Sequence, residues 1–102
     1  MTLREKQSLF VELVGKLIGF AVENGYELTF GDAWARSGHA KHSNHYIRLA
    51  VDFNLFKNGL YQTDTMSHLP LGEFWESLHE LCCWGGRWGD GNHYSLEHEG
   101  RE

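Results

Sequence analysis

The sequence predicts an α+β fold, in which a small antiparallel sheet is combined with a long N-terminal helix and a second, shorter helix. Apolar residues recur at helical spacing in two segments, residues 3–23 and 70–82, and they alternate at strand spacing over residues 46–56. An Asn-Gly pair soon after the alternating run is typical of a hairpin turn. The chain has 102 residues, which suits one domain, residues 1–102, with a single modest core.

The first helix is expected over residues 3–23. Its apolar side chains lie three and four positions apart and give the helix one apolar face, which we expect to pack into the core. Asn24-Gly25 then provides a stop signal, because glycine suits the left-handed conformation of a helix cap. The second helix is expected over residues 70–82, with Pro70 in its first turn.

The main strand is expected over residues 46–56, where alternation predicts one buried face and one exposed face. Asn58-Gly59 is expected to turn the chain back antiparallel to it. The shorter strands are predicted at residues 26–30, 60–63 and 93–96. Residues 31–44 predict a polar, histidine-rich loop, and such loops next to strands often carry functional side chains.

Charge and cysteine content exclude several classes of protein. The formal net charge is −5 and the lysines and arginines do not cluster, which argues against nucleic-acid binding and against a nuclease. The adjacent Cys82 and Cys83 are poorly placed to pair, so we expect free thiols in a reducing compartment. The chain shows no signal-peptide pattern and no apolar run long enough for a bilayer, so we expect cytoplasmic synthesis and no stable membrane association.

A histidine and an aspartate stand out in SNHYIRLAVDFNLF, residues 43–56. Asp52 interrupts an apolar strand, and His45 precedes it by seven positions. Residues seven apart in a regular strand point to opposite faces, so the two can meet only if His45 lies before the strand or if a bulge intervenes. We expect the former, with residues 43–46 forming a turn that leads into the strand.

A second polar pair, Asp90 and His93, lies in the glycine-rich segment near the C-terminus. Catalytic zinc requires three protein ligands, an open position for water and a nearby carboxylate that takes the proton of that water. His45, Asp52 and His93 would supply the ligands, and Asp90 would supply the base.

The remaining aromatic and imidazole side chains receive simpler interpretations. We expect Trp84 to pack in the core, and either Trp88 or Tyr94 to form a wall of the substrate groove. Three histidines are expected to be solvated surface residues, namely His68, His79 and His98.

The segment SNHYIRLAVD, residues 43–52, resembles the S-x-H-x-x-G-x-A-x-D signature of the zinc D-alanyl-D-alanine carboxypeptidase and L-alanyl-D-glutamate endopeptidase family. The segment WGGRWGDGNHY, residues 84–94, resembles that family's closing motif, a Trp-Gly-Gly-x-Trp stretch followed by D-x-x-H and an aromatic residue. The resemblance covers residues 26–96 and implies the fold shared by these peptidases and hedgehog domains, with a zinc cleft on the sheet.

The resemblance also implies residue roles. His45, Asp52 and His93 would bind Zn²⁺, and Asp90 would be the catalytic base. Arg36 resembles the family arginine that holds a substrate carbonyl or carboxylate, a task that suits a fixed guanidinium.

Other positions near the first motif are less closely matched. Ser43 matches the motif's serine and would shape the loop, whereas Arg48 replaces the motif's glycine. His39 and His42 crowd the same region, and either could line the cleft.

The expected function is zinc-assisted hydrolysis of an amide bond in the peptidoglycan stem peptide. L-alanyl-D-glutamate endopeptidase activity is favoured for a lytic role, because removal of a terminal D-alanine does not break the peptidoglycan network. Small single-domain relatives act as bacteriophage endolysins, so we expect a monomer that acts on the cell wall after release from the host cytoplasm. The alternatives are a D,D-carboxypeptidase, a non-catalytic zinc-containing binding domain of the same fold, and a structural zinc site or metal-free domain.

Overall fold

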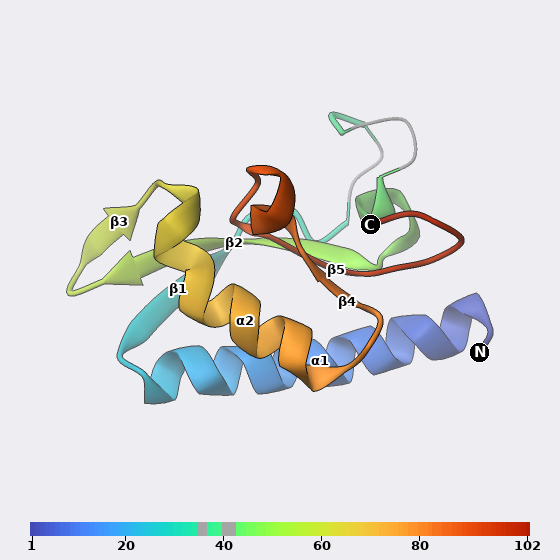
Figure 1. Ribbon diagram of the computed structural model, residues 1–102, viewed down its shortest axis with the longest axis horizontal. Helices are drawn as coiled ribbons and strands as arrows, with labels where there is room; N and C mark the ends of the chain where they lie inside the picture. The colour runs from blue at the N-terminus through green and yellow to red at the C-terminus, as the bar shows by residue number, and fades with distance from the viewer. Residues whose placement is uncertain (35–36, 40–42) are drawn as a thin grey trace.

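The computed structural model describes residues 1–34, 37–39 and 43–102. Within these residues, the fold consists of two helices and a five-stranded antiparallel sheet, with three short 3₁₀ helices between them (Figure 1). The helices and strands in chain order are α1 (Leu3–Glu23), β1 (Tyr26–Phe30), β2 (Ala50–Lys57), β3 (Leu60–Gln62), α2 (Leu69–Leu78), β4 (Cys82–Trp84) and β5 (His93–Leu96). The 3₁₀ helices are η1 (Asn44–Ile47), η2 (Thr65–His68) and η3 (Gly85–Trp88). The predicted α+β class is confirmed.

Helix α1 has the predicted bounds. The Thr2 hydroxyl accepts a hydrogen bond from the Glu5 amide, and the Glu5 carboxylate accepts one from the Thr2 amide, so both ends of a capping box are present. Gly25 follows the helix with φ of 82°, in the left-handed region predicted for it. The buried side of α1 is the apolar face expected from the sequence, and it consists of Phe10, Leu13, Val14, Leu17 and Ala21.

Strand β2 organises the sheet. The strand order is β1-β2-β5-β4, and β3 also pairs with β2. Strand β1 pairs with one edge of β2, and β3 and β5 pair with the other edge. On that edge, β3 pairs with Leu55–Lys57 and β5 pairs with Ala50–Asp52. The Asn58-Gly59 turn joins β2 to β3 as predicted, with φ of 53° and 75°.

Two boundaries differ from the sequence-based expectation. Strand β2 begins at Ala50 rather than at residue 46, because Asn44–Ile47 forms η1 and Arg48 then takes a left-handed conformation. Helix α2 ends at Leu78 rather than at residue 82, because the backbone of the next residue, His79, is extended. The apolar residues that follow are not the end of the helix. They form β4, which the sequence analysis missed, and β4 pairs with β5.

The core lies between the two helices and the sheet. Trp75 of α2 is fully buried, and its ring meets Phe10 of α1 edge-on at 5.8 Å between centroids. The Trp75 indole donates hydrogen bonds to the carbonyls of Cys83 and Ser95, which ties α2 to β4 and β5. Cys82 and Cys83 are free, as predicted, and burial raises the pKa of the Cys82 thiol to about 12.

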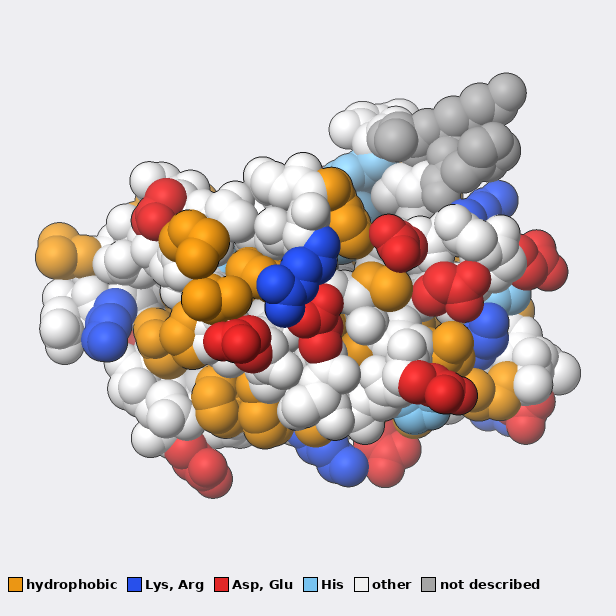
Figure 2. All heavy atoms as spheres, viewed as in Figure 1, with side chains coloured by type: hydrophobic (Ala, Val, Ile, Leu, Met, Phe, Trp, Pro, Cys, Tyr) orange, Lys and Arg blue, Asp and Glu red, His pale blue; other side chains and the backbone are white. Residues whose placement is uncertain are grey.

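Acidic and basic side chains are interspersed on the surface shown in Figure 2 and form no extended basic patch there. In the described part of the chain, neither helix combines the length and apolarity that crossing a bilayer requires.

Candidate metal centre and active site

The pairing of β2 with β5 brings two of the predicted ligands together. Asp52 and His93 are direct partners in the antiparallel register, although they lie far apart in the sequence. The backbone of Asp52 is held from the other side, because its amide donates to the Asp32 carbonyl and its carbonyl accepts from the Gly31 amide, each at 2.7 Å. The carboxylate therefore projects from a backbone that is hydrogen-bonded along both edges.

The third predicted ligand, His45, is delivered by η1. The Ser43 hydroxyl caps this turn by accepting a hydrogen bond from the His45 amide at 3.2 Å. The prediction that His45 lies in a turn before the strand is confirmed. Arg48 then reverses the chain with φ of 59°, a conformation in which glycine is unstrained. This conformation explains why the motif that the segment resembles has glycine at the same position.

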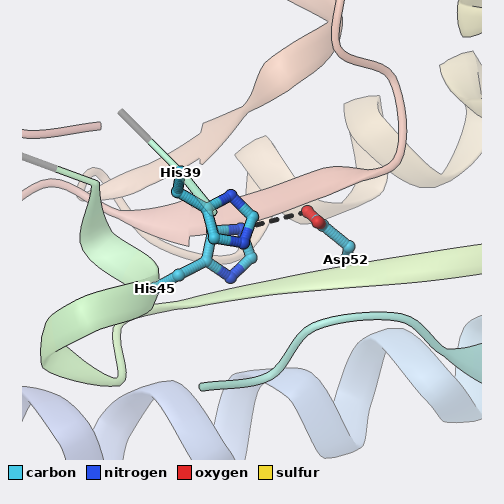
Figure 3. Close-up of side chains that lie close together, drawn as sticks. All are labelled: His39, His45 and Asp52. Atoms are coloured by element: carbon cyan, nitrogen blue, oxygen red, sulfur yellow. Dashed lines mark ion pairs between the residues drawn. The ribbon is translucent and has the colours of Figure 1, made fainter. Parts of the chain in front are cut away.

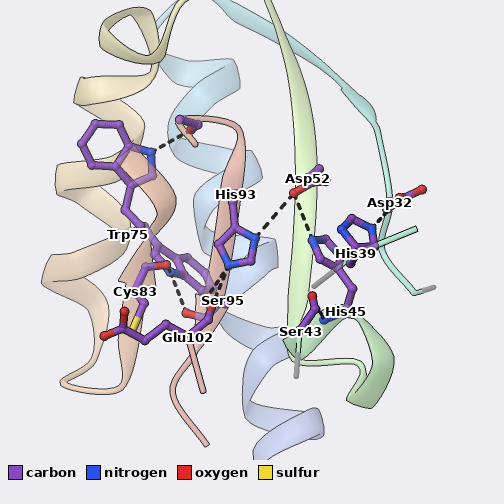
Figure 4. A network of polar contacts seen from close by, with 12 residues as sticks. Asp32, His39, Ser43, His45, Asp52, Trp75, Cys83, His93, Ser95 and Glu102 are labelled. Atoms are coloured by element: carbon purple, nitrogen blue, oxygen red, sulfur yellow. Dashed lines mark hydrogen bonds and ion pairs between the residues drawn. The ribbon is translucent and has the colours of Figure 1, made fainter. Parts of the chain in front are cut away.

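The two imidazoles lie on either side of Asp52 (Figure 4). The His45 Nε2 atom is 3.2 Å from Asp52 Oδ1, and the His93 Nδ1 atom is 3.7 Å from the same oxygen. Both histidines are buried, at 2% and 6% exposure, respectively. Asp52 Oδ1 is itself buried and makes no hydrogen bond to any described residue. A cation between these three groups would satisfy that oxygen, and two imidazoles with one carboxylate are a ligand set that suits zinc.

The electrostatics of Asp52 follow from this arrangement. Burial alone would raise the pKa of the Asp52 carboxyl, but the facing His45 and His93 outweigh burial and lower the pKa to about 2. Asp52 is therefore ionised at neutral pH and is ready to act as a metal ligand.

Two overlapping groups of side chains could hold a metal ion, and Asp52 belongs to both. One consists of His39, His45 and Asp52 (Figure 3), and the other of Asp52, Asp90 and His93, with ligand atoms within 4.8 Å of one another in each group. His39 thus joins the site that the sequence predicted. Its ring stacks on His45 at 4.0 Å between centroids, and its Nε2 atom lies 2.7 Å from Asp32 Oδ2.

A cavity of about 520 Å³ opens over these groups. Its lining includes His45, Asp90 and His93, and Trp88 contributes an aromatic wall that is 47% exposed. The segment 100–102 lines the cavity as well. A buried set of ligand atoms therefore faces an open volume that contains a carboxylate, which is the arrangement required for metal-assisted hydrolysis.

A protein-family model described as D-alanyl-D-alanine carboxypeptidase matches residues 36–96, more than half of the chain, including all the metal-capable residues named above. The chain belongs to this family of M15 peptidases. Membership places it among peptidoglycan-related metallopeptidases, which are hydrolases and are typically zinc-dependent. Comparison with curated proteins and with solved structures gave no match.

The M15 peptidase fixes the orientation of the His93 ring. The His93 Nε2 atom contacts the Glu102 carbonyl at 2.8 Å and the Ser95 hydroxyl at 3.0 Å, and the hydroxyl also donates to that carbonyl. A carbonyl only accepts, so Nε2 carries a proton, and Nδ1 is the ring nitrogen that faces Asp52 and could bind a metal ion. Ser95 is a partner that the sequence analysis missed, although its position two residues after His93 in an alternating strand places both side chains on one face.

The loop that carries Asp90 is held by residues on both sides. The Thr65 hydroxyl of η2 donates to the Gly89 carbonyl at 3.1 Å and accepts from the Gly91 amide at 3.2 Å. Gly85 allows the loop to close, because a Cβ there would lie 2.2 Å from the Asp90 carbonyl oxygen. The role of Thr65 has no signal in the sequence, since it depends on a contact between two loops of the folded peptidase.

One prediction near the site is wrong. His68 was expected on the surface, yet it is only 3% exposed and its Nδ1 atom lies 2.9 Å from the Tyr94 hydroxyl. The prediction that either Trp88 or Tyr94 forms a wall of the groove is met by Trp88, which lines the cavity, whereas Tyr94 is fully buried in the core. Trp84 is buried as predicted, and its indole donates to the Gly91 carbonyl at 2.7 Å. The error for His68 arises because it lies in a polar segment whose burial depends on packing against β5.

Other candidates have less direct roles. His79 and His98 are partly exposed, which agrees with their predicted surface positions. Arg36 and His42 lie outside the described residues, so the structure gives no position for either side chain.

Proposed function

We propose that this M15 peptidase is a zinc-dependent hydrolase that cuts an amide bond of the peptidoglycan stem peptide, with L-alanyl-D-glutamate endopeptidase activity and an endolysin-type role in lysis. The observation that carries the proposal is the approach of His45 Nε2 and His93 Nδ1 to one buried oxygen of Asp52, beside Asp90 in an open cavity. Family membership supports the reaction class.

His45, Asp52 and His93 would hold the zinc ion. When bound, zinc supplies a Lewis acid that activates water near neutral pH and stabilises negative charge on the substrate carbonyl. The buried hydrogen bonds of His93 to Ser95 and Glu102 orient its Nδ1 atom for this purpose.

Asp90 is proposed as the general base and acid. Its carboxylate would accept the proton of the attacking water and then return a proton to the leaving amine. The hydrogen bonds that Thr65 makes to both neighbours of Asp90 fix the loop, so the carboxylate need not be reorganised during the reaction. Arg36 is proposed to hold the substrate carbonyl or carboxylate, on the strength of the sequence resemblance alone.

The cellular role is proposed on the same basis. The protein would be made in the host cytoplasm, would reach the cell wall after release, and would act as a monomer without nucleic acid or a stable membrane association. The net charge of −5 supports the proposal that nucleic acid is not a partner, and the basic side chains on the face shown in Figure 2 are scattered.

The test combines metal analysis with product analysis. Zinc content after dialysis should be about one ion per chain for the wild type and for Asp90→Asn, and it should be strongly reduced in Asp52→Asn, which lacks the shared carboxylate. Asp90→Asn should lower kcat on peptidoglycan by about 100-fold or more, because the base is lost. Glu12→Gln, an exposed change on α1, serves as the matched control and should leave both values unchanged.

Mass spectrometry of the products identifies the bond. A new N-terminal D-glutamate indicates endopeptidase activity, whereas released D-alanine indicates the D,D-carboxypeptidase that the family description names. A zinc-loaded wild type that cuts neither bond would favour the binding-domain alternative, and a zinc-free, inert protein would refute the proposal.

A further inference from the structure

A second cavity adjoins the proposed catalytic base, Asp90. We propose that it is a substrate subsite that binds an uncharged backbone amide of the stem peptide, with the ring N–H of His68 donating to a peptide carbonyl. This inference rests on the proposed function, because it places the same peptide in a second part of the same cleft.

The position of the cavity follows from the sheet. Strands β3 and β5 share one edge of β2, and the chain segments that leave this edge enclose a volume of about 170 Å³. Its lining includes Phe53 of β2, Gln62 of β3, Thr65 of η2, and Asn92, the residue before β5. Asp90 lines this cavity as well as the larger one that contains His45 and His93. A peptide whose scissile bond lies at Asp90 can therefore extend from one cavity into the other.

His68 is a polar side chain that lines this cavity. The side chain lines the cavity although it is 97% buried, and its Nδ1 atom is paired with the Tyr94 hydroxyl. Among the described residues, that hydroxyl has no other hydrogen-bond partner. A buried hydroxyl proton without an acceptor is costly, so Tyr94 donates to Nδ1. The proton of the neutral ring is then on Nε2, for which the described residues offer no acceptor.

The ring stays neutral at physiological pH. Burial lowers the pKa of His68 to about 4, and the opposing effect of the Asp64 charge is smaller. His68 is therefore a fixed neutral donor, and the group that suits it is a carbonyl oxygen.

The charged residues around the cavity indicate whether the bound substrate group is charged or neutral. Asp64 and Asp90 are its acidic residues, and no Lys or Arg is among the described residues that line it. A substrate carboxylate would be repelled and would find no cation there. An uncharged backbone amide is compatible with both carboxylates and can use the donor on His68.

Two substitutions separate this role from simple packing. His68→Asn places an oxygen near the position of Nδ1 and can still accept from Tyr94, but it removes the donor at Nε2. His68→Gln places an amide N–H near the position of Nε2 and loses the acceptor for Tyr94. A subsite role predicts that Asn is the damaging change, and a purely structural role predicts that Gln is.

The experiment measures kcat/KM for wild type and both variants on a full synthetic stem peptide and on peptides shortened by one residue from either end. We expect His68→Asn to lose about 3- to 10-fold on the full peptide, the effect of one neutral hydrogen bond, and to match the wild type on one of the shortened peptides. His68→Gln should stay within about twofold of wild type on all of them. An equal loss on every peptide, or a loss with Gln rather than Asn, would overturn the inference while leaving the peptidase activity established.

A second measurement does not depend on the stability of the variants. In zinc-loaded Asp90→Asn with labelled histidine, NMR should show His68 protonated on Nε2, and this resonance should shift when uncleaved full-length peptide is added. Protonation on Nδ1, or no shift at saturating peptide, would refute the subsite. If the wild type cleaves no stem peptide and Asp90→Asn binds none, the proposed function fails and the subsite fails with it.

Discussion

His68 should make the stability of the fold depend on pH in a defined window. Burial lowers its pKa from 6.5 to about 4. Between these two pH values His68 is therefore protonated in the unfolded chain but neutral in the folded protein. Stability is therefore unaffected above pH 6.5, falls as the pH drops toward 4, and loses nothing further from this residue below 4. The difference of about 2.5 pKa units corresponds to about 3 kcal/mol of unfolding free energy.

The shifted groups Asp52 and His93 affect stability mainly outside this window. The stability that ionised Asp52 contributes is lost as the pH falls from about its unfolded pKa of 3.8 to its folded pKa of about 2, so it overlaps only the acid end of this window. The pKa of His93 is raised: burial opposes the shift, but contacts with Asp52 and with the Glu102 carbonyl outweigh it. The stability that protonated His93 contributes is therefore complete below pH 6.5 and is lost only as the pH rises. A fall in stability between pH 6.5 and 4 that depends on residue 68 can thus be assigned to His68.

The assay is urea unfolding of wild type and His68→Asn at pH 7, 5.5 and 4, with excess chelator so that metal release does not contribute. Subtraction of the variant's values removes the titration of the remaining carboxylates. The difference between the two proteins should fall by about 3 kcal/mol across the series. A difference that does not change with pH would show that His68 titrates normally, and the burial argument would be wrong.

Three further predictions concern packing and positioning. Gly86→Ala should lower the free energy of unfolding by about 2 kcal/mol, because the added Cβ would lie 2.1 Å from a ring carbon of Trp84. Gly19→Ala, on an open face of α1, is its control and should raise that free energy by about 0.5–1 kcal/mol; equal effects in urea unfolding would refute the packing argument. Thr65→Val should lower kcat on stem peptides by about 10-fold with little change in KM, because it removes the hydrogen bonds around the proposed base, and Thr65→Ser should restore it. Arg48→Gly should raise the free energy of unfolding by about 0.5–1 kcal/mol, because residue 48 has φ of 59°; a loss of stability would contradict the assigned strain.

The three candidate metal ligands come from three different elements of the fold. Asp52 is supplied by the strand at the middle of the sheet, His45 by the turn before it, and His93 by the strand paired with it. Because Asp52 and His93 are register partners, a shift of β5 by one residue would turn His93 to the opposite face. The site therefore depends on the same hydrogen bonds that hold the sheet together.

The sequence by itself determined the features that depend on near neighbours. The apolar period of residues 3–23 predicted α1 with its bounds, and the Asn58-Gly59 pair predicted the β2–β3 hairpin. The geometric conflict between His45 and Asp52 predicted a turn before the strand, and η1 is that turn. These predictions succeed because helix faces, hairpin turns and side-chain alternation are set by residues a few positions apart.

Only the tertiary structure decided the features that depend on distant contacts. The three residues of β4 follow directly after a helical pattern, and they become a strand because β5 offers an edge to pair with. Three features arise from segments that meet only after folding. They are the burial of His68, the hydrogen bond from Thr65 to the Asp90 loop, and the contact of His93 with Glu102. Local patterns carry no information about which distant segment will cover a side chain, so the sequence identified the candidate ligands, whereas the fold decided what surrounds them.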